Sequence, residues 1–115
     1  MPLLTLETNV PISPEKTSEL LAALSAVTAK TIGKPEQYVM ATLRPAAILM
    51  SGQPGNAARV DVRSIGGLTG PVNAQLSAAI CRLLQASLGV SPERVYLNFS
   101  DVKASHWGWN GETFG

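Results

Sequence analysis

The sequence predicts an α+β fold in which two pseudo-symmetric βαβ units form one four-stranded mixed sheet, with two helices on one face. Two observations predict it. Alternating apolar residues, typical of strands, and apolar residues at helical spacing follow each other as strand, helix and strand in each half of the chain. The halves also repeat each other, since Ile32–Val39 (IGKPEQYV) is echoed by Leu88–Val95 (LGVSPERV).

The first half of the chain contains the first unit. Alternation predicts a strand over Pro2–Thr8. A helix is predicted from Ser13-Pro14 to about Thr31, because serine is a favoured N-cap and proline suits the first helical position. Its apolar stripe consists of Leu20, Leu21, Leu24 and Val27. A strand follows over Tyr38–Leu43, and a further short strand is predicted over Ala46–Met50.

The second half repeats this order after the turn-rich stretch 51–56. Alternation predicts a strand over Arg59–Ile65. Thr69-Gly70-Pro71 leads into a second helix, which Gly89 ends. The apolar stripe of this helix consists of Leu76, Ile80, Leu83, Leu84 and Leu88. The last strand is predicted over Val95–Ser100.

The two units are expected to combine in one sheet. A right-handed crossover makes the two strands of each unit parallel, and both helices then cover one face in a ferredoxin-like, split arrangement. The other face has no cover. Apolar residues such as Leu3 and Met40 point to a partly apolar open face, so the sequence predicts an oligomer.

Composition limits the class of protein. The 115 residues form a single predicted domain, 1–115, and nine Lys and Arg against eight Asp and Glu give a net charge of +1. The basic residues are scattered, so neither a nucleic-acid-binding stripe nor a polybasic membrane anchor is predicted. Cys81 is the only cysteine and is expected to be a small buried thiol, which excludes disulfides within the chain and metal sites built on cysteine. With no signal-peptide pattern and no apolar run long enough to span a membrane, we expect a soluble cytoplasmic protein.

Pro2 is the first candidate functional residue. A small second residue favours removal of Met1, which would turn Pro2 into a free secondary amine. An α-amino group titrates at roughly 7.7–8 and can be pushed lower by burial or by a neighbouring cation, so it can act as a base near neutral pH. The alternative is that the proline merely opens an edge or first strand, where its missing N–H costs nothing.

Other polar residues are placed near this base by the predicted topology. Lys34 at a helix exit and Ile65-Gly66 at a strand end are expected at the same edge as Pro2, where Lys34 could bind an anion and lower the pKa of the amine. Tyr96 and Asn98 share one face of the last strand. The alternatives are a solvated lysine at a helix C-terminus and an ordinary polar sheet face.

Several short segments carry a family resemblance in the same order along the whole chain. They are Met1-Pro2-Leu3, Thr8-Asn9-Val10-Pro11, Gly33-Lys34-Pro35 with Tyr38, Ser64-Ile65-Gly66, Ser91-Pro92-Glu93-Arg94-Val95-Tyr96 and Gly108-Trp109-Asn110. Together they resemble the macrophage migration inhibitory factor family of the tautomerase superfamily.

The resemblance implies a homotrimer with three active sites at subunit boundaries. It implies that Pro2 is the catalytic base, that Lys34 and the backbone of Ile65 bind the substrate, and that Tyr96 and Asn98 reach in from a neighbouring subunit. The apolar part of the pocket would be lined by Trp109 and Phe114, with Tyr38 as a further substrate-binding residue.

The chain also departs from this family. Vertebrate members carry a Cys-x-x-Cys pair where this chain has Ala57 and Val60, so no dithiol chemistry is expected. His106 and Trp107, at the expected pocket rim, are bulkier than the family pattern suggests. We interpret His106 as a surface histidine rather than a second base, because Pro2 already fills that role.

The predicted function is keto–enol tautomerisation of aromatic 2-oxo acids, with phenylpyruvate as the small-molecule substrate. Neutral Pro2 removes a proton beside the carbonyl, Lys34 holds the negative charge, and Asn98 and the Ile65 amide donate hydrogen bonds. No cofactor or metal is expected. One alternative is a secreted cytokine-like protein that binds a receptor and keeps a vestigial pocket, although no motif supports a receptor partner. The other is a structural ferredoxin-like module that does not depend on Pro2.

Overall fold

The computed structural model describes residues 1–115 and contains one main sheet, two long helices and a small C-terminal hairpin. The main strands are β1 (Pro2–Thr8), β2 (Met40–Pro45), β3 (Ala58–Ser64) and β4 (Val95–Asp101). The helices are α1 (Pro14–Ile32) and α2 (Gly70–Leu88), and the hairpin consists of β5 (Gly108–Trp109) and β6 (Glu112–Thr113). Three short 3₁₀ turns complete the chain: η1 (Glu36–Tyr38), η2 (Pro92–Arg94) and η3 (Ala104–His106).

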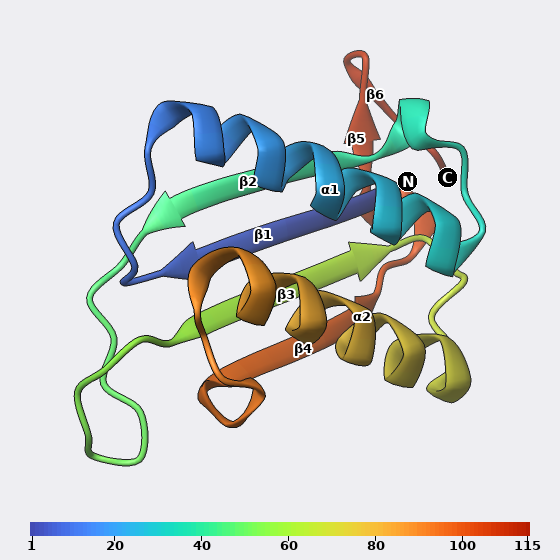
Figure 1. Cartoon of the computed structure of the whole chain (residues 1–115). Helices are drawn as coiled ribbons and strands as arrows, with labels where there is room; N and C mark the ends of the chain where they lie inside the picture. Colours follow the sequence, from blue (N-terminus) through green and yellow to red (C-terminus); the bar gives the residue numbers. More distant parts are fainter.

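The sheet has the order β2-β1-β3-β4, and both helices lie on one of its faces (Figure 1). Strands β1 and β2 are parallel, β3 and β4 are parallel, and the central pair β1 and β3 is antiparallel. The predicted α+β class, with two βαβ units in a four-stranded mixed sheet, is therefore confirmed. The expected split arrangement is wrong, because the two strands of each unit are direct neighbours with no other strand between them.

Both helices begin and end at residues that satisfy their terminal backbone groups. The side chain of Ser13 accepts a hydrogen bond from the backbone N–H of Lys16, and Thr69 caps α2 in the same way. Gly33 and Gly89 follow the two helices in the left-handed conformation, which glycine adopts without a Cβ penalty. The equivalence of the two halves thus extends to their caps.

The core lies between the sheet and the two helices. Alternation along β1 and β3 turns every second side chain toward the helices, and the helix stripes meet them. The buried cluster consists of Leu4, Leu6, Leu20, Leu24, Ile32, Ala58, Val60, Val62, Leu76, Ile80, Leu84, Val90 and Val95. Neither helix is long and apolar enough to cross a membrane.

Three local predictions are wrong. The segment Ala46–Met50 forms no strand, because its backbone makes only one hydrogen bond to β1, from Ala46 N–H to Thr8 O, and an isolated bridge between Met50 and Gln53. Tyr38 lies in η1 rather than in a strand, since the chain makes a 3₁₀ turn after Pro35 before β2 begins. Cys81 is half-buried rather than buried.

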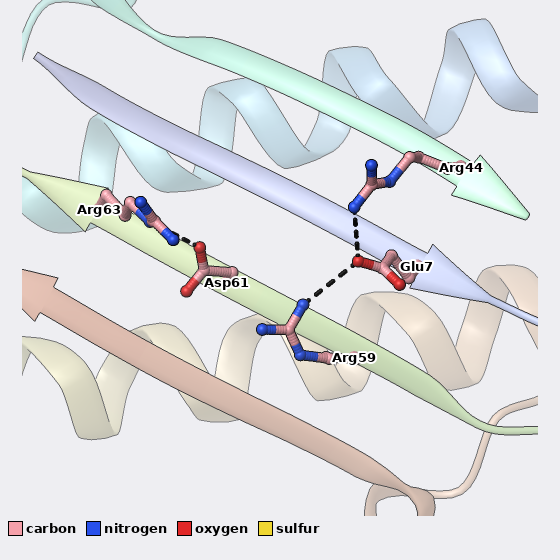
Figure 2. Close-up of polar contacts among 5 residues, drawn as sticks. All are labelled: Glu7, Arg44, Arg59, Asp61 and Arg63. Carbon is pink, nitrogen blue, oxygen red and sulfur yellow. Dashed lines mark hydrogen bonds and ion pairs between the residues drawn. The ribbon is translucent and has the colours of Figure 1, made fainter. Parts of the chain in front are cut away.

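The open face of the sheet is polar at its centre but also carries apolar residues such as Leu3, as expected from the sequence. Figure 2 shows Glu7 on β1 paired with Arg44 on β2 and Arg59 on β3, at 2.8 and 3.2 Å. Asp61 and Arg63 form a further pair on β3, at 2.9 Å. Met40 on β2 and Tyr96 on β4 add exposed apolar side chains to this face, and Leu49 is exposed in the loop after β2. The open face is therefore partly apolar, with its ion pairs at the centre.

Candidate active site

The position of Pro2 is set by strand pairing. Pro2 begins β1 and lies opposite Ser64, the last residue of β3, in the antiparallel register. It is buried and shares the helix-covered face of the sheet with Leu4. The start of β1, the end of β3 and the C-terminus of α1 meet at this edge, together with both termini of the chain (Figure 1).

Lys34 is directed to the same edge by the end of α1. Gly33 turns the chain with a φ of 80°, and the N–H groups of Gly33 and Lys34 both donate to the carbonyl oxygen of Ala29. The side chain of Lys34 lies beside Gly67: a Cβ atom added to Gly67 would be 3.5 Å from Lys34 Cε. Lys34 thus leaves the helix toward the region of Pro2, as predicted.

The amino group at this edge is a stronger candidate base than an ordinary terminus. Burial lowers the pKa of the Met1 amino group below its usual value of 8.0, and the positive charge of Lys34 lowers it further. Both effects disfavour the ammonium form. An amine here is consequently neutral, and able to accept a proton, at lower pH than an exposed terminus.

The turn after β3 brings a free backbone donor beside Pro2. Ile65 follows Ser64, the residue paired with Pro2, and its N–H has no hydrogen-bond partner in the chain. The Ser64 hydroxyl donates to the carbonyl oxygen of Gly66 at 2.7 Å, which holds the turn in shape. An unpaired N–H next to a buried amine is suited to bind a substrate oxygen.

A cleft of about 720 Å³ opens at this edge. Its lining includes three of the predicted site residues, namely Pro2, Tyr38 and Trp109. It also includes residues that the sequence interpretation did not assign to substrate binding: Met1, Leu3, Gln37, Val39, Met40, Trp107 and Gly108. Trp107 therefore lines the cleft. His106 is exposed and lines a smaller hollow with Arg63 and Val102.

The C-terminal hairpin supplies the aromatic wall. Trp109 and Phe114 stack with ring centroids 6.1 Å apart and an interplanar angle of 11°. Asn110 and Gly111 connect β5 and β6 with φ angles of 53° and 80°, as in a two-residue hairpin turn. Because Trp109 is 61% exposed, its ring is available to a ligand.

Tyr96 and Asn98 are not brought to this cleft within one chain. In the sheet register, Tyr96 aligns with Arg59 and Glu7, at the opposite end from Pro2. Glu7 lies five positions after Pro2, which corresponds to about 16 Å along the strand. Both side chains also lie on the open face, whereas Pro2 lies on the helix-covered face.

Tyr96 and Asn98 line a different hollow of about 410 Å³, bounded mainly by the loop 46–51. The side chain of Arg94 holds the end of this loop by donating to the carbonyl oxygens of Met50, Gln53, Gly55 and Asn56. No group of three or more His, Cys, Asp or Glu side chains is placed to hold a metal ion.

Comparison with known proteins identifies the family. The family model described as "Macrophage migration inhibitory factor (MIF)" matches residues 1–115. The chain belongs to the macrophage migration inhibitory factor family. The resemblance seen in the short sequence segments is thereby confirmed, and membership of this family supports a tautomerase-like or cytokine-like protein.

Relatives and solved structures agree with this family across the whole chain. The macrophage migration inhibitory factor of Meriones unguiculatus is 38% identical over 117 residues, covering 99% of each chain. A homologue from Prochlorococcus marinus has a solved structure with a TM-score of 0.93 and 38% identity, covering 98% of this chain and 99% of that one. The MIF-like protein of Entamoeba histolytica gives a TM-score of 0.95 at 27% identity, with 98% of each chain covered.

Proposed function

We propose that the protein is a keto–enol tautomerase acting on phenylpyruvate-like 2-oxo acids, with Pro2 as general base after Met1 is removed. One observation carries the proposal. The Met1 amino group, whose pKa is lowered by burial and by the charge of Lys34, lies next to the buried Pro2 in a cleft that also holds Tyr38 and Trp109. A base, a cation and an aromatic wall are what a carboxylate-bearing aromatic substrate requires.

The proposed reaction moves one proton. The neutral Pro2 amine takes a proton from the carbon between the ring and the carbonyl group, and the electron pair of the broken C–H bond forms the enol double bond. The carbonyl oxygen becomes an enolate oxygen and then receives the proton back from the Pro2 ammonium. Substrate and product have the same atoms and the same oxidation state, so the step uses no redox partner.

The surrounding groups stabilise the charge that develops. Lys34 binds the substrate carboxylate and offsets the enolate charge, and the unpaired N–H of Ile65 donates to a substrate oxygen. The ring of the substrate packs against Trp109 and Phe114. A positioned general base whose pKa lies near the working pH contributes roughly 10²–10⁴-fold to the rate.

The complete site is proposed to form between subunits of a homotrimer. Tyr96 and Asn98 lie far from Pro2 in their own chain and are exposed, which supports their use by a neighbouring subunit. Leu49 and Met40, 69% and 62% exposed, offer apolar area near the sheet edges for such an interface. In a closed ring each subunit gives Pro2 to one site and Asn98 to the next.

The test of this function is an assay of phenylpyruvate enolisation, with the mass of the protein measured first. Protein whose mass shows loss of Met1 is expected to be active. A matched variant with one alanine inserted between Met1 and Pro2 keeps the fold but makes the Pro2 nitrogen an amide, and it is expected to be inactive. Equal activity of the two proteins would rule out Pro2 as the base.

The names of the relatives favour a second candidate, a cytokine-like protein that binds a receptor. The same inserted-alanine variant discriminates the two functions. Receptor binding with no enolisation in either protein would support the second candidate, whereas enolisation that depends on a free Pro2 supports the enzyme.

A further inference from the structure

Asp101 holds the turn that follows β3 and contains Ile65, Gly66 and Gly67. It is the last residue of β4 and pairs with Ser64 at the end of β3 in the parallel register. Its carboxylate Oδ1 accepts a hydrogen bond of 2.9 Å from the N–H of Gly66. The next residue, Val102, donates its N–H to the carbonyl oxygen of Ser64 at 2.9 Å. The turn after β3 is therefore tied to the end of β4 at two successive points.

The turn has little else to fix its conformation. Gly66 and Gly67 have φ angles of 74° and 82°, and two consecutive glycines in the left-handed region allow many other backbone conformations when unconstrained. The Ser64 hydroxyl holds the carbonyl oxygen of Gly66, and the Asp101 carboxylate holds the N–H of the same residue. These two side-chain hydrogen bonds fix the peptide groups on both sides of Gly66.

The orientation of this turn matters to two groups of the proposed site. The first is the unpaired N–H of Ile65. It lies between the carbonyl oxygen of Ser64, which Val102 holds, and the N–H of Gly66, which Asp101 holds, so both contacts at the end of β4 bear on its direction. The second is Lys34, because a Cβ atom on Gly67 would lie 3.5 Å from Lys34 Cε and 2.8 Å from Ile32 Cγ2. The conformation of the turn thus affects the direction of the Ile65 N–H, and the turn also lies beside the aliphatic part of the Lys34 side chain.

Asp101 itself stays outside the reacting groups. It is exposed and does not line the cleft at Pro2. Its carboxylate acts on the site through the backbone of Gly66 rather than by contact with a substrate. A role of this kind would require the position of the acceptor oxygen rather than the charge of the carboxylate.

We propose that Asp101 is a positioning residue of the tautomerase site: its carboxylate holds the N–H of Gly66 and thereby orients the Ile65 donor and the Lys34 stem toward the substrate. The inference rests on the proposed function. It predicts that any side chain which keeps an acceptor oxygen at the same place preserves the site, whatever its charge.

Two substitutions separate geometry from charge. Asp101→Asn keeps an acceptor oxygen at the same distance from the backbone and loses the charge. Asp101→Glu keeps the charge and moves the oxygen outward by one methylene group. Because a misplaced site group can cost up to about 10²-fold, kcat/KM for phenylpyruvate is expected to fall about tenfold to a hundredfold in Asp101→Glu and to stay within about threefold of wild type in Asp101→Asn. Glu19→Ala, which removes an exposed carboxylate with no hydrogen-bond partner, is the matched control and should change nothing.

A second readout does not depend on activity. Amide hydrogen exchange of Gly66, followed by NMR, is expected to be as slow in Asp101→Asn as in wild type and faster in Asp101→Glu. The inflection of the pH–rate profile should be the same in wild type and Asp101→Asn. If wild type does not enolise phenylpyruvate, the proposed function fails, while Gly66 exchange and phenylpyruvate binding, followed by tryptophan fluorescence, still show whether Asp101 orients the turn.

The proposal is overturned by either of two results. One is wild-type exchange and wild-type kinetics or binding in Asp101→Glu, which would mean that the oxygen position is irrelevant. The other is Asp101→Asn impaired as strongly as Asp101→Glu, with a shifted pH inflection, which would mean that Asp101 acts through its charge.

Discussion

Pro2 and Ser64 face each other across the antiparallel pair β1 and β3, and this register places Ile65 one residue beyond the proposed base. The pairing is built into the core of the fold, since β1 and β3 are the two central strands of the sheet. The base is therefore positioned by a rigid element, and the free Ile65 N–H lies at the first residue of the turn that follows β3.

The aromatic wall is expected to select substrates. Replacing Trp109 with alanine removes the ring that stacks on Phe114 and faces the cleft. An aromatic pair contributes about 0.5–1.5 kcal/mol, so KM for phenylpyruvate should rise about threefold to tenfold in Trp109→Ala. Pyruvate, which has no ring, should show little change. Equal losses for both substrates would place Trp109 outside the ring-binding part of the cleft.

Gly67 is expected to be the most sensitive glycine of the site. Alanine at Gly67 would place a Cβ atom 2.8 Å from Ile32 Cγ2, and the φ of 82° is already unfavourable for alanine. The left-handed conformation costs about 1–2 kcal/mol, and the crowding adds about 1–3 kcal/mol.

Gly52→Ala provides the control for Gly67→Ala. Gly52 has a φ of 69°, and a Cβ atom added there would have no neighbour within 4 Å, so only the conformational cost applies. Urea denaturation of both variants should show the larger loss of unfolding free energy for Gly67→Ala. Similar losses would mean that Ile32 moves aside without cost.

Sites shared between subunits predict recovery of activity on mixing. Pro2→Ala and Asn98→Ala trimers are each expected to be impaired, because each lacks one half of every site. After unfolding and refolding together in equal amounts, about a quarter of the sites should combine an intact Pro2 from one subunit with an intact Asn98 from its neighbour. Activity measured after mixing should exceed that of either variant alone. If mixing gives only the average of the two variants, each site is formed within one chain.

The ion pairs of Glu7 predict a pH-dependent contribution to stability. The hydrogen bond from Arg44, followed by the charges of Arg44 and Arg59, holds the pKa of Glu7 below its usual value of 4.5, although burial opposes the shift. A carboxylate with a lowered pKa in the folded state stabilises the fold above its unfolded pKa. That contribution is lost as the pH falls through the lowered value.

Glu7→Gln should therefore unfold at lower urea concentration than wild type at about pH 7, and the two midpoints should converge as the pH falls through the lowered pKa of Glu7. Glu15→Gln, at an exposed position with no ion pair, is the control. A difference between wild type and Glu7→Gln that stays constant with pH would show that the charge of Glu7 is not involved.

Much of the fold could be predicted from the sequence because its signals are local. Caps such as Ser13 and glycines such as Gly33 mark the helices directly, and the repeated halves reveal the two βαβ units. The polar centre of the open face could not be derived from pairs such as Leu3 and Leu4, because the charged residues Glu7, Arg44 and Arg59 meet only through the sheet register.

The candidate site also has parts that local sequence signals predict and parts that depend on the sheet register. Pro2, Lys34 and Ile65 could be brought together by reasoning about strand and helix ends. The hydrogen bond between Gly66 and Asp101 joins residues 35 positions apart and depends on the pairing of β3 with β4, so no local sequence signal predicts it. The hairpin at Asn110-Gly111 does have a local signal that the sequence interpretation did not use, since Asn-Gly favours two-residue turns.

The proposed mechanism depends most on the pKa of the Pro2 amine, and a pH–rate profile measures this pKa directly. Burial and Lys34 both lower the pKa of the amino group at this edge, so kcat/KM of the Met1-free protein should rise with pH through an inflection below the usual α-amino value of 8.0. In Lys34→Ala the inflection should move to higher pH, because one of the two causes is removed. A flat profile between about pH 5 and pH 8.5, or an inflection that is the same with and without Lys34, would contradict the roles assigned to Pro2 and Lys34.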